Sequence, residues 1–130
     1  MKKIKLIITI LLFANISLTY SQDKSESLKI IWENKSLQDA VRFKAINDFY
    51  DNYTQSDPDS SLKLAEFHYK LAKQKKNRKE EALALNEKAF VFYMLGYKLD
   101  KINSVLQEVM GIYTELKNYN GLASTKNNLA

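Results

Sequence analysis

Apolar side chains recur along the chain at steps of three and four residues, the spacing that places them on one face of an α-helix. Four such stripes follow one another between residues 43 and 116. No window alternates apolar and polar positions between hairpin turns in the manner of a strand. The sequence therefore predicts an all-α fold of antiparallel helix pairs with short connections. The stripes are Phe43, Ile46, Tyr50 and Tyr53; Leu62, Ala65, Tyr69 and Ala72; Ala82, Leu85, Ala89 and Phe92; and Leu99, Ile102, Leu106, Val109, Tyr113 and Leu116.

Polar clusters stand between the stripes and predict the turns. They read SDPDSS, KKNRK and LGYK, and KNYNG follows the last stripe. Asp57 followed by Pro58 is typical of a helix start. The Asp side chain accepts hydrogen bonds from the free amides of the first turn, and Pro at the first helical position sacrifices no hydrogen bond, because an amide there has no partner within the helix. Gly96 suits the turn after the third helix.

The last ten residues, GLASTKNNLA, repeat part of the third helix at an offset of 41 residues. This register predicts the first helix of a further unit, with Leu129 and Ala130 packed on a helix that would follow. A ten-residue helix is marginal on its own. We therefore expect the chain to be truncated, or its last helix to pack on the fourth stripe with one apolar side uncovered. The matching pairs are Ala82 and Ala123, Asn86 and Asn127, and Ala89 and Ala130.

The first residues follow a different pattern. Three lysines precede the apolar run LIITILLFA, and a small, polar end follows. Residues 1–21 are therefore predicted to be a secretory signal peptide cleaved after Ser21, which makes the protein exported, periplasmic or extracytoplasmic. The alternative is an uncleaved membrane anchor, but Asn15 interrupts the apolar run before the ~18 to 20 residues that a membrane span needs. No other span is expected.

Charge and cysteine content narrow the function classes. The chain has 20 Lys and Arg against 15 Asp and Glu, and three of the lysines lie in the leader, so 17 basic and 15 acidic residues leave the mature chain at +2. This small excess predicts no nucleic-acid partner. The absence of cysteine excludes disulfides and thiolate metal sites, so packing alone must hold the mature chain together.

The segment that begins PDSSLKLAEFHYKLAKQKKN resembles tetratricopeptide repeats of the longer kind, with a spacing of about 40 residues in place of roughly 34. The resemblance covers residues 37–130 and implies a short α-solenoid of about two repeats plus the first helix of a third. Residues 22–36 are then an N-terminal lead-in. The resemblance also implies a protein or peptide partner, with self-association through the repeats as a further possibility, and no cofactor.

Small and apolar residues at matching positions carry this resemblance. The family places small residues where two helices cross closely, an aromatic residue on the first helix and a glycine in the turn. Large residues at a close crossing produce packing strain. The resemblance therefore implies repeat packing by Ala65, Tyr69, Ala72, Leu85, Ala89, Phe92, Gly96, Ile102, Leu106, Val109 and Ala130.

A narrower resemblance concerns the segment from Ile31 to Asn77, with Trp32 ahead of the first helix and Arg42 within it. It looks like the exported N-terminal repeat region of bacterial signalling proteins. In that family a membrane helix and a cytoplasmic adenylate or guanylate cyclase domain follow, and related proteins end in a histidine kinase or a DNA-binding regulator. The 130 residues contain no such catalytic part.

Three functions remain open. The first is a non-catalytic module that binds a protein or peptide, as the extracytoplasmic sensory or scaffolding region of a larger signalling protein. The second is the N-terminal regulatory part of a longer protein, a nucleotide cyclase or histidine kinase that is anchored in the inner membrane. The third is a free-standing periplasmic adaptor.

Catalytic and metal-binding patterns are weak in this sequence. His68 is the single histidine, and without cysteine it could hold zinc only with carboxylates, so a helix-surface or inter-helix position is the better interpretation. Asp57 and Asp59 lack the EF-hand spacing, and helix capping explains them. Glycine patterns for phosphate or dinucleotide binding are absent. No catalytic, cofactor or metal residue is predicted.

Two surface features remain as candidates for binding. Six of the ten residues from Lys70 to Lys79 are basic. They could bind phosphates or an acidic partner. We favour the alternative, that they are solvated cations at the end of a helix, where they complement its dipole. Glu87, Phe90 and Tyr93 project away from the stripe that ends at Phe92. We therefore predict these three residues to line a peptide-binding groove, with core or neighbour packing as the alternative for each aromatic residue.

Overall fold

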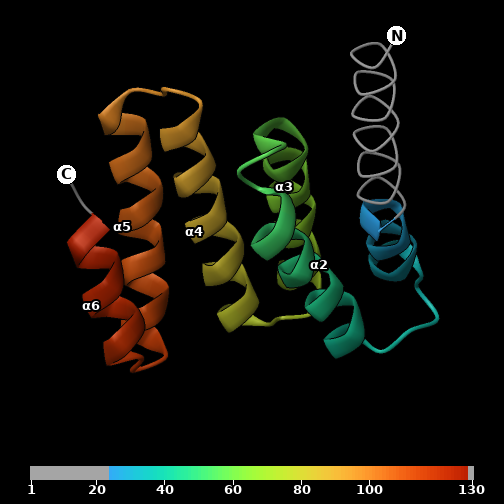
Figure 1. Ribbon diagram of the computed structural model, residues 1–130. Helices are drawn as coiled ribbons and strands as arrows, with labels where there is room; N and C mark the ends of the chain where they lie inside the picture. The colour runs from blue at the N-terminus through green and yellow to red at the C-terminus, as the bar shows by residue number, and fades with distance from the viewer. Residues whose placement is uncertain (1–23, 129–130) are drawn as a thin grey trace, which may run out of the picture. The chain divides into compact units, whose positions relative to one another are not determined.

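The computed structural model describes residues 24–128, and this part of the chain is almost entirely helical, with no strand (Figure 1). The all-α prediction is confirmed. Residues 1–21, Leu129 and Ala130 lie outside the described residues. No helix in the described part is both long and apolar enough to cross a membrane. A helix over residues 24–33 is followed by α2 (Asp39–Tyr53), α3 (Pro58–Gln74), α4 (Arg78–Met94), α5 (Leu99–Glu115) and α6 (Tyr119–Asn128).

The chain divides into two compact units between Ala45 and Ile46, within α2. In the first unit, the buried Arg42 donates from Nε to the carbonyl oxygen of Trp32 at 2.8 Å. This bond ties the helix over residues 24–33 to the start of α2. That helix lies in the predicted lead-in, where the sequence carries no recognised stripe.

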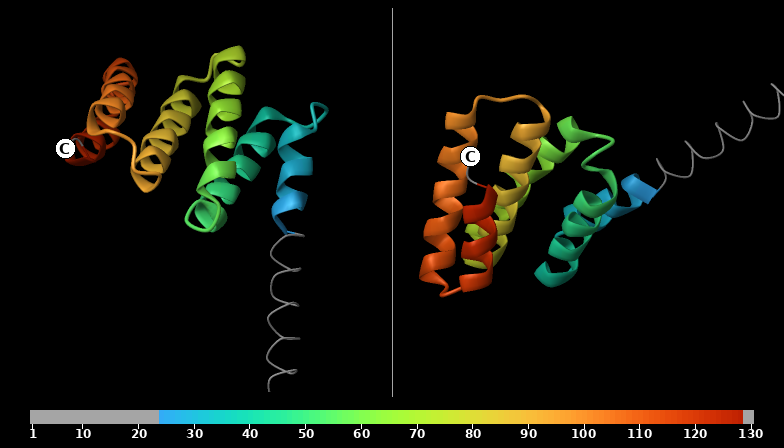
Figure 2. Two further views of the ribbon diagram at one scale, coloured as in Figure 1. Left: turned by 90° about the horizontal axis from the view of Figure 1, so that it is seen from above. Right: turned by 60° about the vertical axis from the view of Figure 1, so that its left-hand side comes forward.

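In the second unit, helices that follow one another in the chain pack side by side: α3 on α4, α4 on α5 and α5 on α6 (Figures 1 and 2). Two apolar clusters join α4 to α5, and the third stripe lies entirely within them. One contains Ala82, Leu85, Val109, Ile112 and Tyr113; the other contains Ala89, Phe92, Ile102 and Leu106.

Helix α4 is buried on a second face that the stripe does not include. Ala84 and Val91 are fully buried, yet neither belongs to the clusters shared with α5. Lys88 lies on the same face, and its Nζ is 3.4 Å from Oε1 of Glu66 in α3. This face of α4 therefore packs on α3, and α4 is enclosed by a helix on either side.

The predictions differ from the structure at the start of α6 and at the two ends of the fourth stripe, and they agree with it at the start of α3. Helix α6 begins at Tyr119, two residues before the predicted start, because Asn118 caps it by accepting a hydrogen bond from the Gly121 amide at 3.0 Å. Leu99 and Leu116, the end members of the fourth stripe, are exposed because they flank the buried length of α5. Asp57 and Pro58 begin α3 as predicted, with Asp57 accepting from the Ser60 amide.

Three helices end in the same backbone motif. The residue after the cap has positive φ, with values of 53° at Lys76, 71° at Gly96 and 52° at Lys117. In each case the next amide bonds to a carbonyl five residues back at 2.9 Å, which defines a Schellman motif. The turn at Gly96 is confirmed, whereas the two lysines adopt a conformation that favours glycine.

The eleven residues implied in repeat packing differ in their burial. Eight are buried, whereas Tyr69 is half-buried and donates from its hydroxyl to Glu108 at 2.9 Å. Gly96 is exposed and acts through its backbone, and Ala130 lies outside the described residues. The buried eight are Ala65, Ala72, Leu85, Ala89, Phe92, Ile102, Leu106 and Val109.

Helix α6 approaches α5 closely at Gly121. A Cβ atom placed there would lie 2.8 to 2.9 Å from three ring carbons of Tyr113. The Tyr113 ring is buried, and its hydroxyl accepts a hydrogen bond from Asn86 Nδ2 at 3.0 Å, so the ring cannot swing away freely. Gly111 in α5 has nothing within 4 Å of a Cβ at its position.

The two glycines therefore predict opposite effects of alanine. Gly111→Ala should raise the free energy of unfolding by about 0.5 to 1 kcal/mol, because alanine loses less backbone entropy in a helix. Gly121→Ala should lower it by about 1 to 2 kcal/mol through overpacking against Tyr113. Urea unfolding followed by circular dichroism measures both. Equal stabilisation by the two variants would contradict the close approach of α6 to α5.

Candidate functional site

A groove of about 750 Å³ opens in the second unit, bounded by α2, α4, α5 and α6. Its volume lies within the range of about 300 to 1,000 Å³ that is usual for ligand-binding clefts. The lining residues are mostly apolar or aromatic, with amides and two carboxylates among them. They are Asn47, Tyr50, Asp51, Leu83, Asn86, Glu87, Ala89, Phe90, Tyr93, Leu99, Ile102, Asn103, Leu106 and Ser124.

Helix α4 supplies the three residues that the sequence analysis selected. Glu87, Phe90 and Tyr93 recur at steps of three residues, and all three line the groove. Glu87 is half-buried, whereas both aromatic rings are exposed. This third face of α4 is free because its other two faces pack on α3 and α5. The structure thus brings the three residues together, and their role in binding a peptide stays a prediction.

Two hydroxyl groups hold Glu87 in position. Thr54 follows the end of α2, and its Oγ1 donates to Glu87 Oε1 at 2.6 Å. Thr54 Oγ1 in turn accepts from the Oγ of Ser61 in α3 at 3.2 Å. Both hydroxyl residues are buried, so their orientation is restricted. Thr54 and Glu87 are thus paired although they lie 33 residues apart in the sequence, and helical periodicity does not reveal such a pair.

The carboxyl group of Glu87 has a pKa raised from its ordinary value. Burial is the largest cause, and the nearby carboxylate of Asp51 raises the pKa further. The hydrogen bond from Thr54 and the charge of His68 act in the opposite direction, but they do not outweigh burial. The ionised form of Glu87 is thus less favourable in the folded protein than in the unfolded chain.

The single histidine contacts Tyr50, one of the groove-lining residues. His68 is fully buried, with Nε2 at 2.9 Å from Glu80 Oε2 and Nδ1 at 3.3 Å from the hydroxyl oxygen of Tyr50. The inter-helix interpretation of His68 fits these contacts, which join α2, α3 and α4. Burial also raises the pKa of the Tyr50 hydroxyl well above its usual value, and the charges of Glu87 and Glu80 add to this rise. The tyrosine therefore remains a neutral hydrogen-bonding group.

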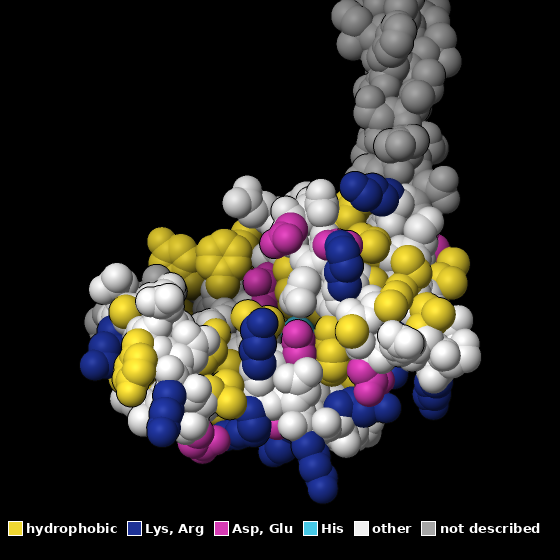
Figure 3. All heavy atoms as spheres, turned by 90° about the horizontal axis from the view of Figure 1, so that it is seen from below, with side chains coloured by type: hydrophobic (Ala, Val, Ile, Leu, Met, Phe, Trp, Pro, Cys, Tyr) yellow, Lys and Arg dark blue, Asp and Glu magenta, His cyan; other side chains and the backbone are white. Residues whose placement is uncertain are grey.

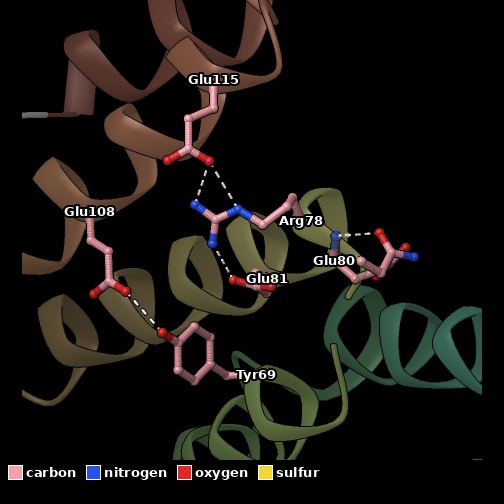
Figure 4. Close-up of polar contacts among 7 residues, drawn as sticks. Tyr69, Arg78, Glu80, Glu81, Glu108 and Glu115 are labelled. Carbon is pink, nitrogen blue, oxygen red and sulfur yellow. Dashed lines mark hydrogen bonds and ion pairs between the residues drawn. The ribbon is translucent and has the colours of Figure 1, made fainter. Parts of the chain in front are cut away.

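A second polar cluster, made by Arg78, Glu81 and Glu115, consists of residues that do not line the groove (Figure 4). Arg78 donates to one oxygen of Glu115 in α5, from Nε at 3.0 Å and from Nη2 at 2.6 Å, and it also pairs with the buried Glu81. These bonds tie α4 to α5. We assign this cluster to packing of the helices, because its charged groups are satisfied by one another.

The basic run from Lys70 to Lys79 is divided between two helices and the turn that joins them. It extends from the last turns of α3 into the start of α4, and Arg78 is used in the pair with Glu115. Lys73 places its Nζ 5.2 Å from the centre of the Tyr69 ring, a cation–π contact. On the face shown in Figure 3, Lys and Arg side chains are interspersed with acidic and hydrophobic ones. This distribution fits a solvated helix end.

Groups of three or more histidine, cysteine or carboxylate side chains able to hold a metal ion do not occur between residues 24 and 128. The groove is lined by carboxylate, amide and aromatic side chains together with aliphatic ones. Comparisons with protein-family models, with curated proteins and with solved structures find no match for this chain.

The raised pKa of Glu87 predicts a pH-dependent stability. An acid whose pKa is raised in the folded state stabilises the fold below its unfolded pKa, and this stability is lost as the pH rises through the folded pKa. Glu87→Gln keeps an acceptor for Thr54 and removes the charge. At pH 7 the variant should therefore unfold at higher urea concentration than the parent protein, and the difference should shrink as the pH falls toward 4.5, the ordinary value. A difference that is independent of pH would contradict the assignment.

Proposed function

We propose that this chain is a non-catalytic helical-repeat module of the tetratricopeptide type that binds a protein or peptide segment in the groove. The module would act as the extracytoplasmic sensory or scaffolding region of a signalling protein, with residues 1–21 as its export signal. Because the chain contains no cysteine, its fold would be insensitive to an oxidising compartment.

Regular spacing of the helices supports the repeat part of the proposal. Helix α5 begins at Leu99, 41 residues after α3 begins at Pro58, and α6 begins at Tyr119, 41 residues after α4 begins at Arg78. The turn chemistry has the same offset. Lys76 and Lys117 both have positive φ, and the asparagine after each of them caps the next helix. One supersecondary unit thus occurs twice, as expected of a stacked repeat.

The observation that carries the binding part is the exposure of two aromatic rings on the groove. Phe90 is 45% exposed and Tyr93 is 69% exposed, and both line a groove that already contains the exposed Leu99. Large aromatic side chains at such positions are typical anchors of protein interfaces, where their burial supplies much of the binding energy. Helix α4, the first helix of a pair in this register, contributes more of the lining residues than any other helix, and stacked helical repeats bind peptides in a groove lined by such helices.

Substitution of the two aromatic residues tests this function. Phe90→Ser and Tyr93→Ser should each weaken binding about fivefold or more, because an interface anchor contributes more than about 1 kcal/mol. Binding is measured by fluorescence anisotropy with a library of fluorescein-labelled ten-residue peptides, against the purified protein. Hits are retested on each variant.

Matched substitutions outside the groove serve as controls. Phe67 and Tyr119 are 37% and 74% exposed and do not line the groove, so Phe67→Ser and Tyr119→Ser should leave the affinity within about twofold. If the control variants lose as much affinity as the groove variants, or if no library peptide binds, the proposed function is wrong.

A further inference from the structure

The charges on the groove are of one sign. Asp51 of α2 and Glu87 of α4 are lining residues, and the residues that line the groove as described include no lysine or arginine. The whole chain carries an excess of basic residues, so this local balance is opposite to the overall one. A segment bound here meets negative charge next to apolar and aromatic surface.

Glu87 is placed to accept a further hydrogen bond. Thr54 occupies Oε1, and within the described part of the chain Oε2 has no hydrogen-bond partner. The hydroxyl chain through Thr54 fixes the carboxylate, so little conformational freedom is lost when a ligand pairs with it. A half-buried carboxylate beside Asp51 is destabilised by burial and like charge, and a cation would relieve both effects.

The apolar residues around this carboxylate indicate that the cationic group of the ligand is attached to an apolar part. Leu83 and Phe90 flank Glu87 along the groove-lining face of α4, and Leu99 reaches the groove from the start of α5. A free metal ion or small polar cation would leave these side chains uncovered. A long aliphatic stem with a charged tip covers them while its charge reaches the carboxylate.

We propose that the groove selects a peptide segment in which one lysine or arginine stands between apolar residues, with the cation paired to Glu87 and Asp51 and the apolar neighbours on Phe90, Tyr93 and Leu99. This inference rests on the proposed function and specifies its ligand class. Glu87 determines specificity for charge, and the aromatic rings supply affinity that does not depend on charge.

Three peptides that differ at one position test the selection. Each is an acetylated, amidated ten-residue Leu and Ser peptide with a fluorescein label, and its central residue is lysine, norleucine or glutamate. Fluorescence anisotropy should give the lysine peptide an affinity about tenfold higher than the norleucine peptide, because a hydrogen bond to a charged group discriminates by that amount or more. The glutamate peptide should bind more weakly than both.

The variant Glu87→Gln should remove the preference for lysine, so that the lysine and norleucine peptides bind with affinities within about twofold of each other. Glu108→Gln is the matched control, because Glu108 also accepts a hydroxyl hydrogen bond, from Tyr69, but lies outside the groove. It should leave both affinities unchanged.

The outcomes separate the two proposals. If the three peptides bind equally and Phe90→Ser weakens all of them, the groove binds peptides but the selection by charge is wrong. A lysine preference that survives in Glu87→Gln also overturns the selection by Glu87. If no peptide binds, the proposed function fails, and the inference fails with it.

Discussion

The enclosure of α4 between α3 and α5 is the constraint on which the second unit depends. One face of α4 carries Ala82, Leu85, Ala89 and Phe92 into the clusters shared with α5, and another buries Ala84 and Val91 toward α3. An amphipathic helix can bury a single face against one neighbour, so a helix that is apolar on two faces requires a neighbour on each side. Only the third face, with Glu87, Phe90 and Tyr93, remains available for a ligand.

Packing of the helices around α4 also holds the half-buried carboxylate of Glu87 in a fixed position at the groove. Burial and the charge of Asp51 disfavour ionisation of Glu87, yet Thr54 and Ser61 hold the group in place. Glu87 lines the groove, and a carboxyl group whose pKa is raised by burial at such a position is a candidate for ligand binding. In contrast, the Arg78 cluster satisfies its own charges and joins α4 to α5.

The sequence predicted features that depend on local spacing. Helical stripes, the cap at Asp57 and the turn at Gly96 follow from residues within a few positions of one another. The predicted start of α6 was wrong, because the NYNG sequence resembles a turn. In the structure, Asn118 caps a helix that contains Gly121. Contacts between distant residues could not be predicted: Thr54 with Glu87, His68 with Glu80, and the second buried face of α4 depend on how the helices stack.

The central claim is that ligands bind on the third face of α4, next to Glu87. Amide chemical shifts of the ¹⁵N-labelled protein, followed during titration with the lysine peptide, test this claim most directly. Binding in the groove should give saturable shifts concentrated at Tyr50, Glu87, Phe90 and Tyr93, which line it. Shifts concentrated instead at Tyr69, Lys73 and Arg78, or spread over the unit without saturation, would contradict it.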